Sequence, residues 1–301
     1  MRKNFPITEL CEALGVSRSG YHNLGKREPS KRRRANEQLL HQIRIIHSDR
    51  HTRCYGSPRM TRELRALGIA CSENRVARIM RSRDLRARPR RPFRPKTTQP
   101  DHAAHPSPNL LSQAGSPSAS GTVLVSDITY IPTREGWLYL AVVIDLFSRA
   151  ILGWKLSDSL HAALVVDAAT RAIDSGLVSR GAIFHSDRGC QYSAAITREL
   201  LARHGLRQSM SAKGYCYDNA FSESAFASLK SEVLGDGLPF DSKRAATTAL
   251  FDYFETFYNR RRLHSSLGYL SPNASLTTQF QHQTPHLNKP SIPLRSPCPL
   301  F

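Results

Sequence analysis

Three acidic residues lie where a carboxylate could do chemistry: Asp127, Asp187 and Glu223. Asp127 interrupts TVLVSDITYI, a strand-like apolar stretch, and burying an ionised carboxylate there is costly unless a cation or strong donors compensate. Asp187 directly follows AIFHS, so we expect it at the carboxyl end of a strand, where open α/β sheets place ligand sites. Glu223 stands among apolar residues in DNAFSESAFASLKSE, and 35 residues separate it from Asp187.

The stretch DNAFSESAFASLKSE predicts an amphipathic helix. Asn219, Glu223 and Lys230 are spaced i, i+4 and i+11, which is close to one helical face. Glu232 lies nine residues past Glu223, so we expect it on the opposite side of the helix as a solvated charge. Asp218 stands at the helix start, where capping is the expected role. Glu223 is therefore the chemical candidate on this helix.

The elements that must position these carboxylates follow an α/β pattern. Stretches rich in β-branched and aromatic residues predict strands, and longer periodic stretches predict helices. The order is three strands, helix, strand, helix, strand, helix, at 122–131, 137–156 (two strands), 161–176, 181–187, 193–205, 206–210 and 218–232. This order is typical of a ribonuclease-H-like mixed five-stranded sheet flanked by helices. A further amphipathic helix with a basic exit is expected within 242–272.

The charge of the chain is concentrated in its first third. The 301 residues carry 43 Lys+Arg and 24 Asp+Glu, a formal net charge of +19. Through Lys96 there are 25 basic and 8 acidic residues, a net of +17, so the other 205 residues carry 18 and 16, a net of +2. A polyanion partner explains this distribution, because each neutralised phosphate releases counterions. The alternative is a basic face that only aids solubility.

A first candidate helix-turn-helix unit lies at about 7–26. Gly15 can take the positive φ of a tight turn, and Ser17 can cap the second helix. Leu10, Leu14 and Val16 are expected to supply the apolar contacts. The basic run KRRR follows and is expected to link this unit to the next helix.

A second candidate unit of the same kind lies at about 55–86. Gly68 is expected to end its first helix. On the outer face of the second helix, Arg75, Arg78 and Arg81 suit contacts with phosphates and base edges. An ordinary solvated face is the alternative for one such helix, but two units followed by RARPRRPFRPK favour DNA binding.

Composition divides the chain into four parts. They are an all-α helix-turn-helix DNA-binding region at 1–87, a basic and then Pro/Ser-rich linker at 88–120, an α/β core with a C-terminal helix at 121–280, and a disordered tail at 281–301. No apolar run reaches the roughly 18 residues of a membrane helix. The six cysteines include no C-x-x-C pair, which argues against a zinc site or disulfide framework and favours a reducing cytosol.

Several motifs together resemble a known family. SDITYIPTREGWLYLAVVIDLFSRAILGW, HSDRGCQYS, KGYCYDNAFSESAFASLKSE and YNRRRLHSSLGYLSP resemble the integrase-type (rve, DDE) core of bacterial insertion-sequence transposases of the second-reading-frame (OrfB) kind. CEALGVSRSGYH and YGSPRMTRELRALG look like the helix-turn-helix segments upstream in those proteins. The resemblance covers most of the chain, from about Leu10 to Pro272.

The resemblance implies a catalytic triad of Asp, Asp and, after 35 residues, Glu, which carries over to Asp127, Asp187 and Glu223. The family's lysine on the same helix matches Lys230 and implies a phosphate or DNA contact. The implied activity is that of a DDE transposase, a polynucleotidyl transferase that cleaves DNA at the element's ends and transfers the strands. Small departures, LVSDITY and SAFASLK, replace residues that usually pack near such a site.

Three carboxylates that converge in one cleft repel one another, and bound divalent cations remove that penalty. Oxygen-only ligands favour Mg²⁺ or Mn²⁺ over zinc. Two such ions ~3.5–4 Å apart suit in-line attack at a phosphodiester. We therefore expect two ions, with Asp127 bridging them, Asp187 on one and Glu223 on the other.

Other residues have two possible roles each. His185 and Arg188 flank the second aspartate and either orient a phosphate or stabilise the local turn. The three arginines at 260–262 either contact DNA or form a solvated basic end. Asp145 is expected in a turn between strands, and Tyr192 in packing.

The implied partners are double-stranded DNA, both the element's terminal inverted repeats and the target, and a second copy of the chain, because two ends must be brought together. An upstream-frame (OrfA) partner or fusion is also implied, in the bacterial cytoplasm at the nucleoid. Two rival functions are a DNA-binding regulator without catalysis, and a ribonuclease-H-like nuclease. The intact carboxylates argue against the first, and the two helix-turn-helix units against the second.

Overall fold

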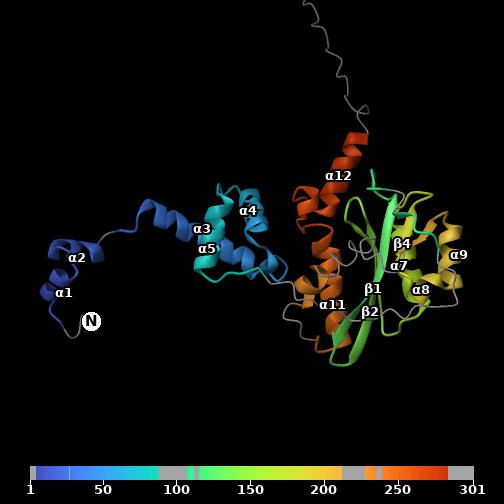
Figure 1. Ribbon diagram of the computed structural model, residues 1–301, viewed down its shortest axis with the longest axis horizontal. Helices are drawn as coiled ribbons and strands as arrows, with labels where there is room; N and C mark the ends of the chain where they lie inside the picture. The colour runs from blue at the N-terminus through green and yellow to red at the C-terminus, as the bar shows by residue number, and fades with distance from the viewer. Residues whose placement is uncertain are drawn as a thin grey trace, which may run out of the picture. The chain divides into compact units, whose positions relative to one another are not determined.

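The structure is a computed structural model that describes residues 5–26, 28–87, 107–111, 115–211, 228–234 and 239–283 (Figure 1). The chain divides into two compact units, Met1–Ala87 and Arg88–Phe301. Within the described ranges, no helix combines the length and the apolar character needed to cross a bilayer.

The N-terminal unit begins with two short helices, α1 (Ile7–Ala13) and α2 (Arg18–Lys26). Gly15 takes a φ of +64° in the turn between them, and the Ser17 hydroxyl accepts a hydrogen bond from the Gly20 amide at 3.0 Å, as expected. The prediction that Leu14 and Val16 supply apolar contacts is wrong, because their exposed fractions are 73% and 48%. Helix α1 ends at Ala13, so both side chains belong to the turn and not to a packed helical face.

A second group of helices forms the core of this unit. Its elements are α3 (Lys31–Ser48), the short 3₁₀ helix η1 (Thr52–Cys54), α4 (Ser57–Ala66) and α5 (Glu73–Ser82). The Ser30 hydroxyl accepts from the Arg33 amide at 3.2 Å, so KRRR forms the first turn of α3 and does not link two elements. Ser72 caps α5 in the same way. The buried side chains of this core are Leu39, Leu40, Ile43, Met60, Leu64, Val76, Ile79 and Met80.

The second unit is built on one mixed sheet. Its strands are β1 (Val123–Thr133), β2 (Gly136–Asp145), β3 (Ile151–Ser157), β4 (Ile183–Ser186) and β5 (Arg207–Met210), in the spatial order β3-β2-β1-β4-β5. The β1–β2 and β2–β3 pairs are antiparallel, and the β1–β4 and β4–β5 pairs are parallel. The predicted five-stranded mixed sheet is confirmed, and β1 occupies its centre.

Helices cover one face of the sheet closely. They are α7 (Ala162–Asp174), α8 (Cys190–Ser193) and α9 (Ala195–Arg203), and they bury Leu124, Val143 and Phe184 of the sheet (Figure 1). A Cβ on Gly153 of β3 would lie 2.2 Å from the Ala168 carbonyl oxygen and 2.6 Å from the Ala172 amide nitrogen. Only glycine therefore allows α7 to approach the sheet this closely.

The C-terminal helices lie on the other side of the sheet (Figure 1). Their elements are α11 (Lys243–Asp252), the π-helical turn η4 (Tyr253–Tyr258), the 3₁₀ helix η5 (Ser265–Leu267) and α12 (Pro272–Gln283), and the π-helical turn η3 (Lys230–Leu234) precedes them. Trp154 of β3 packs against Phe254 with ring centroids 5.0 Å apart. Asn259 donates to the Ile151 carbonyl at 2.8 Å and accepts from its amide at 2.9 Å. These contacts join the C-terminal helices to the edge strand.

Part of the expected linker lies against the sheet. The Leu110 amide donates to the Ser209 hydroxyl at 2.9 Å, and the Ser107 hydroxyl to the Gln208 side-chain oxygen at 3.0 Å. Leu110 and Leu111 pack on the cluster that contains Val123, Val125, Leu146 and Ile183.

Candidate active site

The parallel pairing of β1 with β4 brings the two candidate aspartates to equivalent positions. Val123, Leu124 and Val125 pair with Ile183, Phe184 and His185 in this ladder. Asp127 and Asp187 each lie two residues beyond the last pair, on strands that run in the same direction and are ~4.8 Å apart where paired. The two residues therefore occupy matching positions just beyond the paired part of these two strands.

The alternation of side chains puts both aspartates on one face. Val123, Val125 and Ile183 share a cluster on the face away from α7, whereas Leu124 and Phe184 belong to the cluster under α7. Asp127 has the same parity as Val125, and Asp187 the same parity as Ile183. The aspartates therefore share the face on which the C-terminal helices lie.

Tyr192 gives independent support for this proximity. Its phenol is fully buried and lies 3.1 Å from the Ser126 hydroxyl. Burial raises the pKa of Tyr192 well above its ordinary value, and the negative charges of Asp127 and Asp187 raise this pKa further. Both carboxylates must lie near the phenol to do so. The expected packing role of Tyr192 is confirmed.

The turn after β4 holds Asp187 by its backbone. The Gly189 amide donates to Oδ1 of Asp187 at 3.0 Å, and a Cβ on Gly189 would lie 3.0 Å from the same oxygen. A side chain at position 189 would crowd the carboxylate, so the small residue and the donated hydrogen bond both help to orient it.

Both residues that flank Asp187 make local hydrogen bonds. His185 is fully buried, and its ring nitrogens lie 2.9 Å from the Ser209 hydroxyl and 3.1 Å from the Ser211 hydroxyl. Arg188 donates from Nε to the Ser211 carbonyl at 2.8 Å. His185 therefore ties β4 to β5 and has no surface with which to contact a phosphate. Arg188 ties the turn after β4 to the residue after β5.

Asp145 occupies the expected turn between β2 and β3. Its carboxylate is fully buried, and it accepts from the Ser148 amide at 2.8 Å, the Ser120 hydroxyl at 2.8 Å and the Gly121 amide at 2.9 Å. These donors satisfy the carboxylate, so the structural role predicted for Asp145 is confirmed.

Glu223, the third candidate, lies outside the described residues, together with Asn219 and Asp218. Lys230 begins η3, but its side chain is also outside the described part. The described part of this segment starts at Ser228, and both Ser228 and Leu229 are buried. From Ser228 on, the described residues of this segment are therefore packed into the unit.

The prediction that Glu232 is a solvated charge is wrong. Its side chain is 5% exposed and forms an ion pair of 2.7 Å with Arg262, whose side chain is 4% exposed. The prediction assumed regular α-helical winding, but η3 is π-helical, so the angular position of Glu232 is not the one that nine α-helical residues would give. Arg262 matches neither of its expected roles, since both required exposure. Arg260 and Arg261 are exposed.

The described donors fit a hard divalent cation. Asp127 and Asp187 supply only carboxylate oxygens, which Mg²⁺ and Mn²⁺ prefer, and they share one face of the sheet. In the part of the chain that the structure describes, no group of three or more His, Cys, Asp or Glu side chains is placed to hold a metal. Glu223, the third expected ligand, lies outside the described residues.

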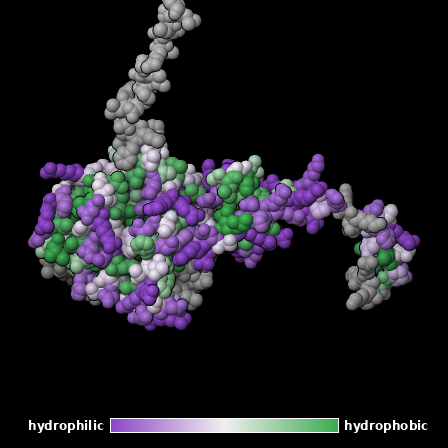
Figure 2. Space-filling view, turned by 180° about the vertical axis from the view of Figure 1, so that it is seen from behind, coloured by the Kyte–Doolittle hydropathy of each residue, from purple (hydrophilic) through white to green (hydrophobic). Residues whose placement is uncertain are grey.

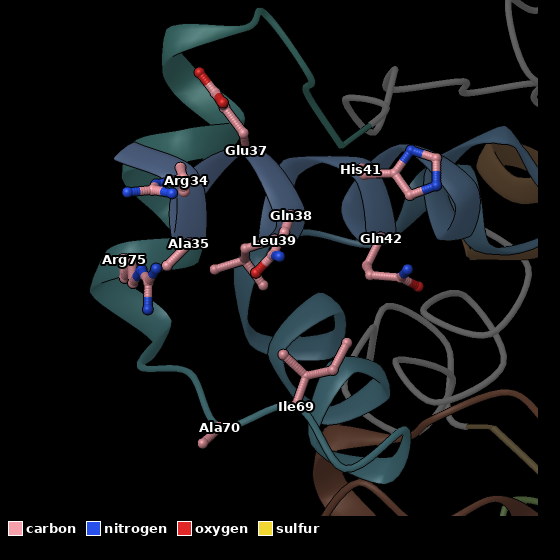
Figure 3. Close-up of a pocket in the computed structure, with 10 residues that line it drawn as sticks. All are labelled: Arg34, Ala35, Glu37, Gln38, Leu39, His41, Gln42, Ile69, Ala70 and Arg75. Carbon is pink, nitrogen blue, oxygen red and sulfur yellow. The ribbon is translucent and has the colours of Figure 1, made fainter. Parts of the chain in front are cut away.

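The candidate DNA-contact arginines of the N-terminal unit lie on α5, and α3 adds further basic residues. Arg78 and Arg81 are exposed, whereas Arg75 is half-buried and donates from Nε to the Asn36 side-chain oxygen at 2.9 Å. A groove of about 800 Å³ lies between these helices and the turn at 69–70. In Figure 3, Arg34 and Arg75 lie together at one end of it.

Polar side chains of α3 continue along this groove. They are Gln38, His41 and Gln42, while Glu37 adds a carboxylate and Leu39 and Ile69 add apolar surface. Figure 2 shows mostly hydrophilic residues with a smaller hydrophobic area on the visible face of this unit. The groove offers hydrogen-bond donors and acceptors of the kinds that bind phosphates and base edges.

Comparison with known families gives three matches. Residues 117–216 match a model described as "Integrase core domain", residues 204–272 match a second model with the same description, and residues 34–93 match an "HTH-like domain". The curated relatives include "Insertion element IS600 uncharacterized 31 kDa protein" of Shigella sonnei, 40% identical over 88% of this chain and 96% of its own length. They also include "Transposase InsF for insertion sequence IS3A" of Escherichia coli, 42% identical over 89% of this chain and 93% of its own length.

Solved structures similar to this chain include two retroviral proteins. The catalytic core domain of BIV integrase is 16% identical, with a TM-score of 0.41, over 54% of this chain and 98% of that one. The HTLV-2 integrase catalytic core domain in complex with magnesium is 14% identical, with a TM-score of 0.39, over 52% of this chain and 97% of that one.

The burial of Tyr192 predicts a specific dependence of stability on pH. We expect Tyr192→Phe to lower the free energy of unfolding at pH 8 by about 0.5–1.5 kcal/mol, because the bond to Ser126 is lost. The raised pKa of Tyr192 means that the folded state holds the phenolic proton more tightly than the unfolded state does. Its contribution is therefore complete below about pH 10 and is lost as the pH rises further.

Urea denaturation of the wild type and of Tyr192→Phe from pH 8 to 11 measures this. The difference in unfolding free energy between them should shrink above about pH 10. A constant difference across this range would contradict the described environment of the phenol.

Proposed function

Because this chain belongs to the bacterial insertion-sequence transposases with an integrase core domain, we propose that it binds the ends of its own element and catalyses Mg²⁺-dependent DNA cleavage and strand transfer. The observation that carries the proposal is the matching position of Asp127 and Asp187 on one face of the sheet, each two residues beyond the last pair of the parallel β1–β4 ladder. A structural or regulatory domain has no need to hold two like charges side by side.

Asp127, Asp187 and Glu223 are the proposed ligands of two Mg²⁺ or Mn²⁺ ions. When bound, these ions supply a nucleophile at neutral pH and neutralise charge on the reacting phosphate. The chain's own residues hold the carboxylates in place. The Gly189 amide orients Asp187, and the buried Tyr192 and Ser126 fill the space beneath the two aspartates, which excludes water there.

The proposed reaction has two steps that use the same site. In the first, the oxygen of a water molecule forms a bond to phosphorus at the end of the element, and the bond to the 3′-oxygen breaks, which leaves a 3′-hydroxyl. In the second, that hydroxyl forms a bond to a phosphorus of the target DNA and displaces the target's own 3′-oxygen. Both steps exchange one phosphodiester oxygen for another, so the carboxylates serve both without being consumed.

The N-terminal unit is the proposed DNA-binding region. Arg78 and Arg81 on the exposed side of α5, and Arg34 and Arg75 in the groove beside α3, supply the positive charge. Lys230 and Arg188 are the proposed DNA contacts near the carboxylates. At least two copies of the chain act on paired ends, alone or with an upstream-frame partner or as a fusion, on the DNA of the bacterial cytoplasm.

Loss of any of the three carboxylates should abolish cleavage. We expect Asp127→Asn, Asp187→Asn and Glu223→Gln each to reduce Mg²⁺-dependent nicking of labelled terminal-repeat DNA by at least about 100-fold, since changes in residues that only support a metal ligand commonly cost 10–100-fold. Asp145→Asn is the matched control, because it neutralises a buried carboxylate on the same sheet that bonds only to its own turn and to 120–121. It should retain cleavage below its melting temperature.

Full cleavage by any of the three variants would refute the assignment of that ligand. DNA binding to the terminal repeats without cleavage by the wild type, at any Mg²⁺ or Mn²⁺ concentration, would instead favour a DNA-binding regulator.

Phosphate contacts from α5 should appear in the salt dependence of binding. We expect Arg78→Ala/Arg81→Ala to reduce the slope of log K against log[salt] by about 2, because each lost phosphate contact removes roughly one released counterion. Arg65→Ala removes a charge from the same unit, but this guanidinium is bound to the Cys71 carbonyl at 2.9 and 3.1 Å, so its slope should change less. Equal slopes for the double variant and the wild type would exclude α5 from the interface.

A further inference from the structure

Two segments that are far apart in the sequence are joined by a buried ion pair. Arg262 donates from Nε to Oε2 of Glu232 and from Nη2 to Oε1, both at 2.7 Å. The carboxylate belongs to η3 and the guanidinium follows η4, with 4–5% of each side chain exposed. Both oxygens of the carboxylate and two nitrogens of the guanidinium take part, so the pair fixes the relative orientation of the two side chains as well as their distance.

The surroundings of the pair complete its hydrogen bonds. The Tyr253 hydroxyl donates to Oε2 of Glu232 at 2.7 Å, and Nη1 of Arg262 lies 3.0 Å from Nε2 of His264. The guanidinium also lies over the Tyr258 ring, 5.4 Å from its centroid. Burial opposes the charge of Arg262, but the nearby Glu232 raises the pKa of the guanidinium well above its usual range, so it stays protonated.

Stability alone does not explain such a pair. Replacing a buried ion pair by apolar residues of similar volume is often neutral or stabilising. What an apolar contact does not provide is a fixed direction between two backbones, which a bidentate pair does. Glu232 and Tyr253 also both lie in π-helical turns, a winding that is rare and is frequent at functional sites. The pair therefore suits a segment that must be held in one orientation.

The ion pair has one partner in η3 and the other after the C-terminal helical turn η4. On one side, Glu232 lies nine residues after Glu223, at the end of the segment that the sequence predicts as one helix. On the other side, Tyr253 contacts Phe254, whose ring packs on Trp154 of β3 with centroids 5.0 Å apart.

The contacts through Phe254 and Trp154 connect to the strand that carries Asp127. Trp154 pairs with Val142 of β2, and Val142 pairs with Asp127 of β1. The ion pair therefore joins η3 to the C-terminal helices, which pack through Phe254 on the sheet row that contains Asp127.

We propose that Glu232 and Arg262 are positioning residues: their ion pair fixes the segment that carries Glu223 on the aspartate face, so that the third carboxylate reaches the cation site of Asp127 and Asp187. This inference rests on the proposed function, because it takes Glu223 to be a metal ligand. Neither residue touches substrate or metal. Breaking the pair leaves all three ligands in the chain but loosens the position of one of them.

Two conservative variants of the full-length chain test this. Glu232→Gln keeps the shape of the side chain and removes its charge. Arg262→Lys keeps the charge and removes the guanidinium group that makes two parallel hydrogen bonds. A third variant, Glu232→Met/Arg262→Leu, removes both charges together and should fold even where a single change leaves an uncompensated charge. Asp145→Asn is the control for loss of a buried carboxylate that bonds elsewhere on the sheet.

The readout is the binding of Mn²⁺ to the protein without DNA, titrated by the loss of the free-ion electron paramagnetic resonance signal. We expect the Mn²⁺ concentration at half-saturation, the midpoint of the titration, to rise about 10-fold in each of the three variants. Changes in residues that support a metal ligand commonly weaken metal binding by this much. Glu223→Gln should raise it by at least as much, and Asp145→Asn should leave it within about 2-fold of the wild type.

Three results would each overturn the inference: wild-type midpoints in all three pair variants, an equal rise in Asp145→Asn, or no rise in Glu223→Gln. The first would give the pair no role at the metal site, the second would reduce its role to general stability, and the third would leave nothing to position. A wild type that binds Mn²⁺ through Glu223 but never cleaves terminal-repeat DNA would refute the proposed function and leave this inference intact.

Discussion

Two carboxylates held at matching positions on neighbouring strands repel one another, and the second unit is arranged around that constraint. At ~4 Å the repulsion is on the order of 1–4 kcal/mol, depending on the effective dielectric. The parallel pairing of β1 with β4 imposes the arrangement, because it fixes the register of Asp127 and Asp187 through three paired residues on each strand. A divalent cation bound between the two carboxylates would replace this repulsion by attraction to a shared positive charge, so the geometry that costs stability suits the proposed metal site.

The elements around the sheet make this arrangement rigid. On one face, Gly153 lets α7 approach the backbone of β3, and Tyr192 packs beneath the aspartates. On the other face, the rings of Trp154 and Phe254 attach the C-terminal helices to the edge strand. One face is thus packed to hold the strands, and the other carries the carboxylates and the C-terminal helices to which η3 is joined.

Sequence reasoning predicted the order of the elements and the places of Asp127 and Asp187, because both depend on local patterns. Alternation and β-branched residues mark strands, and a residue that ends a strand is recognisable from its neighbours. The burial of Glu232 could not be predicted in this way, since it depends on π-helical winding and on Arg262, thirty residues later. A signal was present: Glu232 stands beside apolar residues, and a basic run follows the next predicted helix.

Other differences have similar local causes. KRRR looked like a link because it is highly charged, yet a single serine hydroxyl starts α3 ahead of it. Helix α12 was missed because its polar composition lacks a clear apolar stripe. Leu14 and Val16 were expected in a core, but α1 ends too early to bury them. Patterns thus predicted element types better than they predicted which polar residues the C-terminal helices would bury.

Anomalous scattering from crystals of the full chain with Mn²⁺ and terminal-repeat DNA would test the central claim most directly. The account predicts a manganese peak bound by carboxylate oxygens of both Asp127 and Asp187, just beyond the paired residues of β1 and β4, with an oxygen of Glu223 completing the site. Manganese bound elsewhere, with the two aspartates separated by more than a metal ion can bridge, would contradict it.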